Sequence, residues 1–365
     1  MSASEQQNDV LTEVRGQIGM VTLNRPKALN ALSLGMIRTL TATLQAWRDD
    51  PAVLAVTVRG AGKDGEAFGS FCAGGDIRFF HKAALAGDSA LEDFFTEEYT
   101  LNHLIATYPK PYIAFMDGVV MGGGMGISQG ASLRVVTDRT KMAMPETGIG
   151  LFPDVGGSYF LSRCPGAAGE YLALTGNTIA SPDAIAWGLA DGHIDAVQLP
   201  VLWETLAATP FESANAVEHW VQSRFAAKVV VRKHPLIDKI FGLPSVTDIL
   251  AALDADASDW ARDTAAVLRK RSPLMLHVVL EQVRRGRAMG LADCLRMERV
   301  MVYRSFHLRP GAASETVEGI RALAIDKDHQ PKWNPARIED VTPAMVNAFF
   351  DSPWTAETHP LRALG

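Results

Sequence analysis

The chain has 365 residues, of which 47% are hydrophobic and 21% are charged, and its formal net charge is −6. This length and apolar content allow one large domain or two small ones with a sizeable core. The sequence pI of about 5.9 argues against non-specific nucleic-acid binding, because that binding needs a basic face.

The cysteines and the first residues bear on the cellular compartment. Cys72, Cys164 and Cys294 are odd in number and widely spaced, which predicts buried apolar residues rather than a disulfide framework or a metal site. The opening MSASEQQNDV lacks the basic and apolar regions of a secretory signal, and no run is long and apolar enough to span a membrane. We therefore expect a reducing compartment, the cytoplasm, and no membrane partner.

The first half of the chain alternates predicted strands with predicted helices. The pattern of Ile18–Leu23 indicates an alternating strand, and residues 53–59 indicate a second strand. Between them, Ser33 can cap a helix that runs to about Trp47. Strands that alternate with helices predict an α/β layer structure.

Two loops of small residues each follow a predicted strand and lead into a predicted helix. They are SFCAGGDI at residues 70–77 and MGGGMG at residues 121–126. Consecutive glycines cost backbone entropy, so bare backbone must be needed there. At a helix start, unpaired N–H groups favour negative charge, and two converging amides could stabilise a thioester oxyanion. The alternative is a tight helix–strand crossing where only glycine fits.

Two carboxylates follow the second loop. A short predicted strand over residues 141–144 delivers Glu146, and Asp154 follows eight positions later. Such a carboxylate can act as a general base or a nucleophile. Each also has a structural interpretation: Glu146 as a surface carboxylate, and Asp154 as the cap of a helix that starts near Gly156.

The rest of the chain is predominantly helical. We expect helices over residues 161–175, from Ser181 onward, over 273–287 and over 291–306, a short strand over 193–197, and a helical stretch between 199 and 266. The last hundred residues therefore predict a helical cap or arm on the α/β core.

Several separated motifs, in the same order, resemble the crotonase superfamily, also called the enoyl-CoA hydratase/isomerase family. They are NRPKALNAL, FCAGGDI, GVVMGGGMGIS and MPETGIGLFPDVGG. FFTEEYTLNHLIATYPKPYIA, PDVGGSYFLSR, SPLMLH and EGIRALAIDKDHQPKWNP extend the likeness, now to the 3-hydroxyisobutyryl-CoA hydrolase branch, over nearly the whole chain. The resemblance implies an α/β fold: a crotonase-type spiral of ββα units with the acyl-CoA site over residues 10–200, and a mostly helical C-terminal region over residues 201–365.

The resemblance also implies where an acyl-CoA thioester would bind. The two oxyanion amides would be those of Gly75 and Gly123, and glycine suits such close backbone approach. The CoA part of the substrate is expected along Lys27, Ala28 and Leu29 and along Ala73, Gly74, Asp76 and Ile77.

One position departs from the hydratases of this family, which carry a catalytic Glu where this chain has Gly126. The second family Glu is present as Glu146. Asp154 and Glu98 fall where the hydrolase branch has an Asp and a substrate-contacting Glu. The resemblance therefore implies hydrolysis of a small β-hydroxyacyl-CoA, best 3-hydroxyisobutyryl-CoA, a valine-catabolic intermediate. Glu146 would act as nucleophile or general base, Asp154 would orient water, and Glu98 would bind the 3-hydroxyl group.

Two other functions stay open at this point. One is an enoyl-CoA isomerase or hydratase of the same superfamily, and the other is a non-catalytic acyl-CoA-binding protein. No metal or redox cofactor is implied, because CoA enters as part of the substrate. A homo-oligomer, trimer or hexamer, is the assembly that the resemblance suggests.

Overall fold

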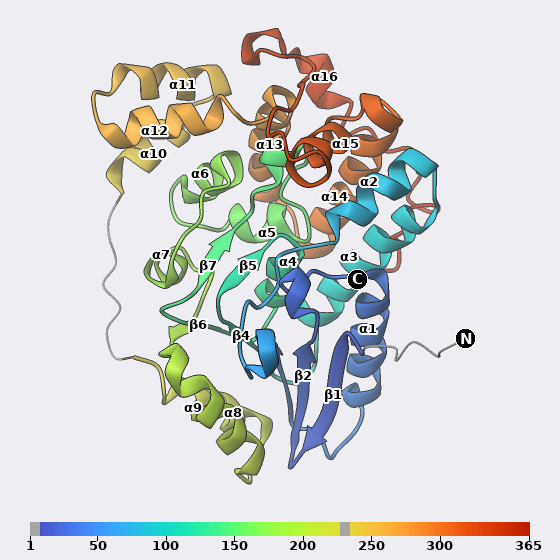
Figure 1. The fold of residues 1–365 in the computed structure, drawn as a ribbon, viewed down its shortest axis with the longest axis vertical. Coiled ribbons are helices and arrows are strands. Elements are labelled where there is room, and N and C mark those ends of the chain that lie inside the picture. Colours follow the sequence, from blue (N-terminus) through green and yellow to red (C-terminus); the bar gives the residue numbers. More distant parts are fainter. Residues whose placement is uncertain (1–7, 227–233) are drawn as a thin grey trace.

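The computed structural model describes residues 8–226 and 234–365, and a mostly parallel sheet lies at its centre (Figure 1). The strands are β1 (Val10–Arg15), β2 (Ile18–Leu23), β3 (Ala55–Gly60), β4 (Tyr112–Met116), β5 (Val119–Met121), β6 (Leu133–Val136), β7 (Lys141–Ala143) and β8 (Gly192–His193). The large sheet has the order β1-β2-β3-β4-β6-β8, with β1 and β2 antiparallel and every later pair parallel. β5 and β7 form a small parallel sheet of their own.

A second ladder beside the large sheet repeats one unit along the chain. Leu32 pairs with Gly75 and Cys72 pairs with Val120, both as isolated parallel bridges, and the pairing of β5 with β7 continues the ladder. Successive turns therefore contribute a strand to the large sheet, a short extended segment to the ladder, and then a helix. This confirms the expected spiral of ββα units.

Helices follow the ladder segments in the first half of the chain. They are α1 (Leu34–Arg48), α2 (Ile77–Ala86), α3 (Ala90–Ala106), α4 (Gly123–Gln129), α5 (Gly157–Leu161), α6 (Ala168–Thr175) and α7 (Ser181–Ala186), with three short 3-10 helices, η1 (Pro26–Ala28), η2 (Lys63–Gly65) and η3 (Glu146–Ile149), among them. Ser33 caps α1 as predicted, because its Oγ accepts a hydrogen bond from the Met36 amide at 3.3 Å.

Beyond residue 198, the described chain forms helices and no strand. They are α8 (Leu199–Ala208), α9 (Ala214–Gln222), α10 (Pro235–Phe241), α11 (Val246–Ala255), α12 (Asp259–Leu268), α13 (Pro273–Gly286), α14 (Leu291–His307), α15 (Glu315–Ile320) and α16 (Pro343–Asn347), with a π-helical turn, η6 (Arg321–Ile325), after α15. α13 packs on α5 and α6, α14 on α3, and α15 on α2. In Figure 1, α10 to α16 lie in the upper part of the molecule, whereas α8 and α9 lie at the bottom.

Both faces of the large sheet are covered, which changes the expected pattern of β2. The predicted strand is present as β2, but every one of its residues is buried, so neither of its faces is exposed. Ile18 and Met20 join a core cluster with Trp203 of α8, whereas Val21 and Leu23 join the larger cluster that includes α1. Strands between two helical layers are apolar on both sides.

Three local expectations need correction. The helix expected over residues 161–175 is divided into α5, which ends at Leu161, and α6, which begins at Ala168, by a loop that contains Pro165 and Gly166, whose φ is 59°. The strand expected over 193–197 is only β8, at Gly192–His193. Part of the helical stretch predicted over 199–266, residues 227–233, lies outside the described residues.

Within the described ranges, no helix is long and apolar enough to cross a membrane. Cys72, Cys164 and Cys294 are buried with free thiols, as predicted. Burial raises the pKa of each thiol to about 12, so none is a thiolate at neutral pH.

Candidate active site

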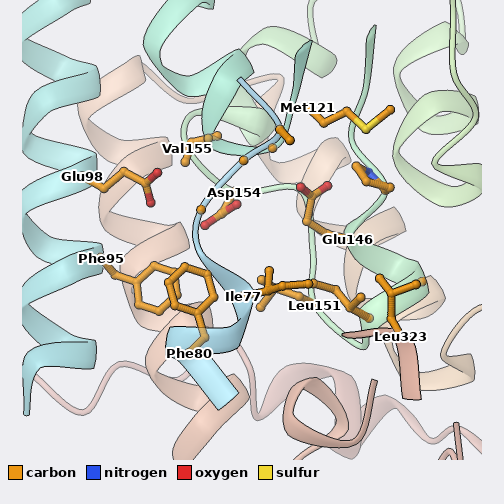
Figure 2. Close-up of a pocket in the computed structure, with 18 of the residues that line it drawn as sticks. Ile77, Phe80, Phe95, Glu98, Met121, Glu146, Leu151, Asp154, Val155 and Leu323 are labelled. Carbon is orange, nitrogen blue, oxygen red and sulfur yellow. The ribbon is translucent and has the colours of Figure 1, made fainter. Parts of the chain in front are cut away.

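A cavity of about 360 Å³ lies where the two glycine loops meet α3 and the segment after β7 (Figure 2). Its acidic side chains are Glu98, Glu146 and Asp154, and in the view of Figure 2 Asp154 lies between the other two. The remaining lining residues are Ala73, Gly74, Gly75, Ile77, Phe80, Phe95, Met121, Gly122, Gly123, Pro145, Gly148, Ile149, Leu151, Val155, Arg271 and Leu323. The cavity therefore combines an apolar wall with a few buried carboxyl groups, as small-molecule sites commonly do.

The two glycine loops come close to one another in this cavity. Gly74 has a φ of 107°, and a Cβ placed on it would lie 3.7 Å from the amide nitrogen of Gly123. Among the described residues, no group accepts a hydrogen bond from the amides of Gly75 or Gly123. Two N–H groups without acceptors therefore lie on adjacent loops, one of them at the start of α4, and such donors are the groups from which oxyanion holes are built.

Glu146 stands at the start of η3 with its side chain against the second glycine loop. A Cβ on Gly122 would lie 2.9 Å from Oε1 of Glu146, so a side chain at Gly122 would displace this carboxyl group. Glu146 is 6% exposed, and its Oε2 has no hydrogen-bond partner among the described residues. Burial, and secondly the charge of Asp154, raise its pKa well above the usual value. The interpretation of Glu146 as a surface carboxylate is therefore wrong.

Asp154 is also buried in this cavity and accepts a hydrogen bond from a tyrosine. The hydroxyl of Tyr99 donates a hydrogen bond to Oδ2 of Asp154 at 2.8 Å. Burial raises the pKa of Asp154 to about 6, and the hydrogen bond from Tyr99 opposes that rise. The alternative role as a helix cap is wrong, because Gly156 is the N-cap of α5 and no side chain caps it.

Glu98 is not a solvated helix carboxylate, because only 2% of it is exposed. Its Oε1 has no partner among the described residues and would lie 2.6 Å from a Cβ placed on Gly123. Burial raises its pKa well above the usual value, and the nearby charges of Asp154 and Glu146 add to the rise. Three carboxyl groups in one buried site cannot all be charged at neutral pH without strong repulsion.

The residues expected to contact CoA divide into two groups. Ala73, Gly74 and Ile77 line the cavity. Asp76 does not: it caps α2 by accepting the Phe79 amide at 3.3 Å, and it also accepts from Arg25.

The segment Lys27, Ala28 and Leu29 lies outside the cavity on the surface. Its backbone is joined to the first glycine loop, because the carbonyl of Leu29 accepts a hydrogen bond from the amide of Ala73 at 3.0 Å. The segment is thus exposed beside a loop that lines the cavity.

Sequence reasoning missed side chains that come from distant parts of the chain. Arg271 lies between α12 and α13, lines the cavity, and donates from Nε to the carbonyl of Thr175 at 2.9 Å. Glu298 of α14 accepts the amides of Gly156 and Ser158 at 2.7 and 2.8 Å, and so fixes the segment that carries Asp154. No local sequence pattern marks Arg271 or Glu298. The partner of Asp154, Tyr99, directly follows the candidate residue Glu98 in the sequence, and this position was the only local signal for it.

One group of side chains in the described residues could hold a metal ion: Asp138, His193 and Asp195 have ligand atoms within 4.8 Å of one another. None of the three lines the cavity. His193 Nδ1 is 3.0 Å from the Ser181 hydroxyl and its Nε2 is 3.2 Å from Asp195. These contacts satisfy the imidazole within the protein.

Comparison with known proteins gives a consistent family. The sequence profile described as enoyl-CoA hydratase/isomerase matches residues 18–350. The rat protein named 3-hydroxyisobutyryl-CoA hydrolase, mitochondrial, is 42% identical over 365 residues, which cover 96% of this chain and 91% of the relative. An Arabidopsis thaliana protein named probable 3-hydroxyisobutyryl-CoA hydrolase 3 is 38% identical, over 94% of this chain and 92% of the relative.

Two solved structures share the whole architecture. A protein of Mycobacterium thermoresistibile described as a carnitinyl-CoA dehydratase superposes with a TM-score of 0.84 at 39% identity, over 94% of this chain and 97% of the other. A protein of Rhodobacter sphaeroides described as an enoyl-CoA hydratase superposes with a TM-score of 0.82 at 35% identity, over 95% and 98%. The names of these relatives therefore agree on acyl-CoA chemistry but differ between hydrolysis and the addition or removal of water.

Proposed function

The chain belongs to the enoyl-CoA hydratase/isomerase family, and we propose that it hydrolyses 3-hydroxyisobutyryl-CoA to 3-hydroxyisobutyrate and CoA. The relatives that carry this name match the chain over nearly its whole length. Two observations together carry the proposal. Glu146 and Asp154 are both buried, and Gly126 occupies the position where hydratases of the family have their other catalytic Glu. In catabolic terms, this reaction belongs to valine degradation.

The fold leaves no room for a side chain at position 126. A Cβ on Gly126 would lie 2.6 Å from Cβ of Val155 and 3.0 Å from Nδ2 of Asn102. Hydration by a pair of carboxylates would lack the carboxylate that hydratases of the family have at position 126. Thioester hydrolysis needs only the oxyanion hole and one base or nucleophile.

The proposed reaction begins with the thioester oxygen between the amides of Gly75 and Gly123. As the carbonyl carbon becomes tetrahedral, its oxygen gains negative charge, which the two N–H groups stabilise. Removing one such donor typically costs about 3 kcal/mol of transition-state stabilisation. Gly148 and Arg271 line the cavity together with Glu146, and the charge of Arg271 favours the ionised form of that carboxyl group.

Glu146 has two routes to the same products. As a nucleophile, it attacks the carbonyl carbon, the C–S bond breaks, the CoA thiolate takes a proton, and water then cleaves the acyl–Glu anhydride. As a general base, it takes a proton from water while the water oxygen attacks the thioester directly; the C–S bond of the tetrahedral intermediate then breaks, and the CoA thiolate takes the proton from Glu146. Asp154, oriented by Tyr99, would position the water in either route.

Glu98 is the proposed contact of the 3-hydroxyl group. Its raised pKa makes the neutral carboxyl group the expected form, which can both donate and accept a hydrogen bond. Because Oε1 of Glu98 lies beside Gly123, this carboxyl group would select acyl groups that carry a hydroxyl near the thioester. The CoA part of the substrate would leave the cavity along residues 73–77 and the exposed segment 27–29.

A thiol-release assay tests the proposal. We expect free CoA from 3-hydroxyisobutyryl-CoA and 3-hydroxypropionyl-CoA, much less from acetyl-CoA, and no thiol from crotonyl-CoA. Loss of enoyl absorbance from crotonyl-CoA without thiol release would instead assign hydration, the activity for which the Rhodobacter sphaeroides protein is named. Binding of acyl-CoA with no turnover would assign a non-catalytic binding protein.

The Glu146→Gln variant tests the central residue. The substitution keeps the shape of the side chain and removes its function as base or nucleophile, so kcat should fall by about 100-fold to 10,000-fold. Glu97→Gln, on the outer side of α3 and half exposed, is the matched control and should keep wild-type turnover. Near wild-type turnover in Glu146→Gln would contradict the mechanism.

Two further parts of the proposal concern the whole protein. We propose a cytoplasmic location, although the rat relative is named as mitochondrial, and cell fractionation with an antibody decides between the two. We also propose a homo-oligomer, trimer or hexamer, which light scattering coupled to size-exclusion chromatography measures directly.

A further inference from the structure

A second cavity of about 180 Å³ lies behind the active site and shares one wall with it. Val155 lines both cavities. The second cavity also contains Asn102 and Gly126 at its inner end, and the exposed residues Arg163 and Gly188 among its lining. It therefore reaches from the protein surface to the back of Val155, and it is large enough for several water molecules.

Asn102 is the unexplained polar group of this cavity. It lies one helical turn after Glu98 on α3, so the two side chains project from the same face of the helix. Glu98 lines the active site, whereas Asn102 lines the second cavity. Asn102 is only 3% exposed, and neither its amide oxygen nor its amide nitrogen has a hydrogen-bond partner among the described residues. A buried amide without partners is costly, which indicates that the cavity supplies them.

Val155 is the one described residue that lines both cavities. Val155 has a φ of 55°, a strained value for a β-branched residue. Its side chain occupies the space beside Gly126, because a Cβ on that glycine would lie 2.6 Å from Cβ of Val155. Since Gly126 contributes no side chain, the side chain of Val155 lies next to Asn102 on the side of the second cavity, while Val155 also lines the first.

Hydrolysis needs a water molecule at the carbonyl carbon while the acyl-CoA fills the first cavity. A substrate that occupies the oxyanion hole also blocks the approach from the side on which it entered. We propose that the second cavity is a rear water passage, in which Asn102 binds the incoming water and Val155 is the gate that admits it to Asp154 and Glu146. This inference rests on the hydrolase function proposed above.

The passage can be narrowed at a residue that takes no part in the active site. Ala106, at the end of α3, is half buried and lines the second cavity but not the first. We expect Ala106→Phe to lower kcat about tenfold, with an unchanged KM for 3-hydroxyisobutyryl-CoA, because water supply and not substrate binding is impeded. Ala86→Phe, on an exposed turn of α2 that lines none of these cavities, is the control and should keep the wild-type kcat.

Asn102 provides an independent test. Asn102→Leu keeps the volume but removes the amide and should lower kcat with KM unchanged. Asn102→Ser leaves a hydroxyl group and room for water, and should retain most of the activity. A purely structural role predicts the reverse order, because leucine fills the buried site and serine leaves a hole.

The outcomes separate this inference from the proposed function. Thiol release by the wild type together with wild-type kcat in both Ala106→Phe and Asn102→Leu would overturn the water passage and leave the hydrolase intact. A change of KM that grows with acyl-chain length in Ala106→Phe would also overturn it, because the cavity would then hold the acyl group. Absence of thiol release by the wild type would refute the hydrolase itself.

Discussion

Asp154 illustrates how a single residue is tuned by its surroundings. Burial favours the neutral carboxyl group, and the hydrogen bond from Tyr99 favours the carboxylate. The two effects leave a pKa of about 6, so Asp154 is mostly ionised above that pH and mostly neutral below it. Glu146 is buried as well. Burial is the main cause that raises its pKa, and the charge of Asp154 is the second cause.

The pH profile of activity should reflect this tuning. We expect kcat/KM for thioester hydrolysis to fall as the pH drops, because protonation neutralises Asp154, whose pKa is about 6, and Glu146, whose pKa is raised, and so removes the charged groups that position and deprotonate the water. Tyr99→Phe removes the hydrogen bond that lowers the pKa of Asp154, so the midpoint of the profile should move to higher pH. A midpoint in Tyr99→Phe equal to that of the wild type would show that Asp154 does not control the profile.

The packing of Gly126 predicts a stability effect. Gly126→Ala places a methyl group against Val155 and Asn102 and should lower the free energy of unfolding by about 1–3 kcal/mol. The control is Gly35→Ala in α1, where the nearest atom to the new Cβ is 3.8 Å away and the helix gains about 0.5–1 kcal/mol. Urea unfolding measures both, and similar values for the two variants would contradict the close contact at Gly126.

At the scale of elements, two C-terminal helices fix the segment that carries Asp154. Gln282 of α13 donates to the carbonyl of Pro153 at 2.6 Å, and Glu298 of α14 accepts the amides of Gly156 and Ser158. The segment includes the strained backbone of Val155, which persists only because its neighbours impose it. The catalytic segment therefore depends on helices more than a hundred positions away in sequence.

Loss of the Glu298 contact should affect both stability and turnover. Glu298→Ala leaves two buried amides without acceptors, at a cost of about 1–3 kcal/mol each, and frees the segment next to Asp154, so kcat should fall as well. Glu281→Ala, a partly exposed residue of α13 that pairs only with Arg285 among the described residues, should change stability by less than about 0.5 kcal/mol. Chemical denaturation and the thiol assay measure the two effects, and wild-type kcat in Glu298→Ala would contradict the positioning role.

At the scale of the molecule, several buried carboxyl groups have no salt-bridge partner among the described residues. Glu98, Glu146, Asp154 and Glu298 are all buried with raised pKa values, about 6 for Asp154 and about 8 for Glu298. Desolvation is the first cause in each case. A carboxyl group whose pKa is higher in the folded state binds its proton more tightly there than in the unfolded chain.

Because the folded state binds these protons more tightly than the unfolded chain, the stability of the protein should depend on pH in a definite direction. The stabilisation from such a group is complete below its unfolded pKa and is lost as the pH rises through its folded pKa. The melting temperature should therefore be higher near pH 5.5 than near pH 8.5, and Glu298→Gln, which cannot ionise, should reduce the difference. Scanning calorimetry at the two pH values tests this, and an equal or larger difference in Glu298→Gln would assign the effect to other groups.

The sequence by itself determined the local features of the site. Runs of glycine after a strand, a cap at Ser33, and Glu146 after a short strand are consequences of neighbouring residues, so they are readable without a structure. Family motifs then supplied the order of the ββα units and the candidate roles of Gly75, Gly123 and Asp154, roles that stay predictions until the variants are measured.

Only the tertiary structure decided which side chains share the cavity. Tyr99 reaches Asp154, Arg271 reaches the wall of Glu146, and Glu298 holds the segment after Asp154, although these partners are far apart in the chain. Burial also decided the protonation of the carboxyl groups, because a pKa depends on desolvation and nearby charge, and neither follows from residue order. The close fit of Val155 against Gly126 is likewise a contact between two separate segments, which no local pattern encodes.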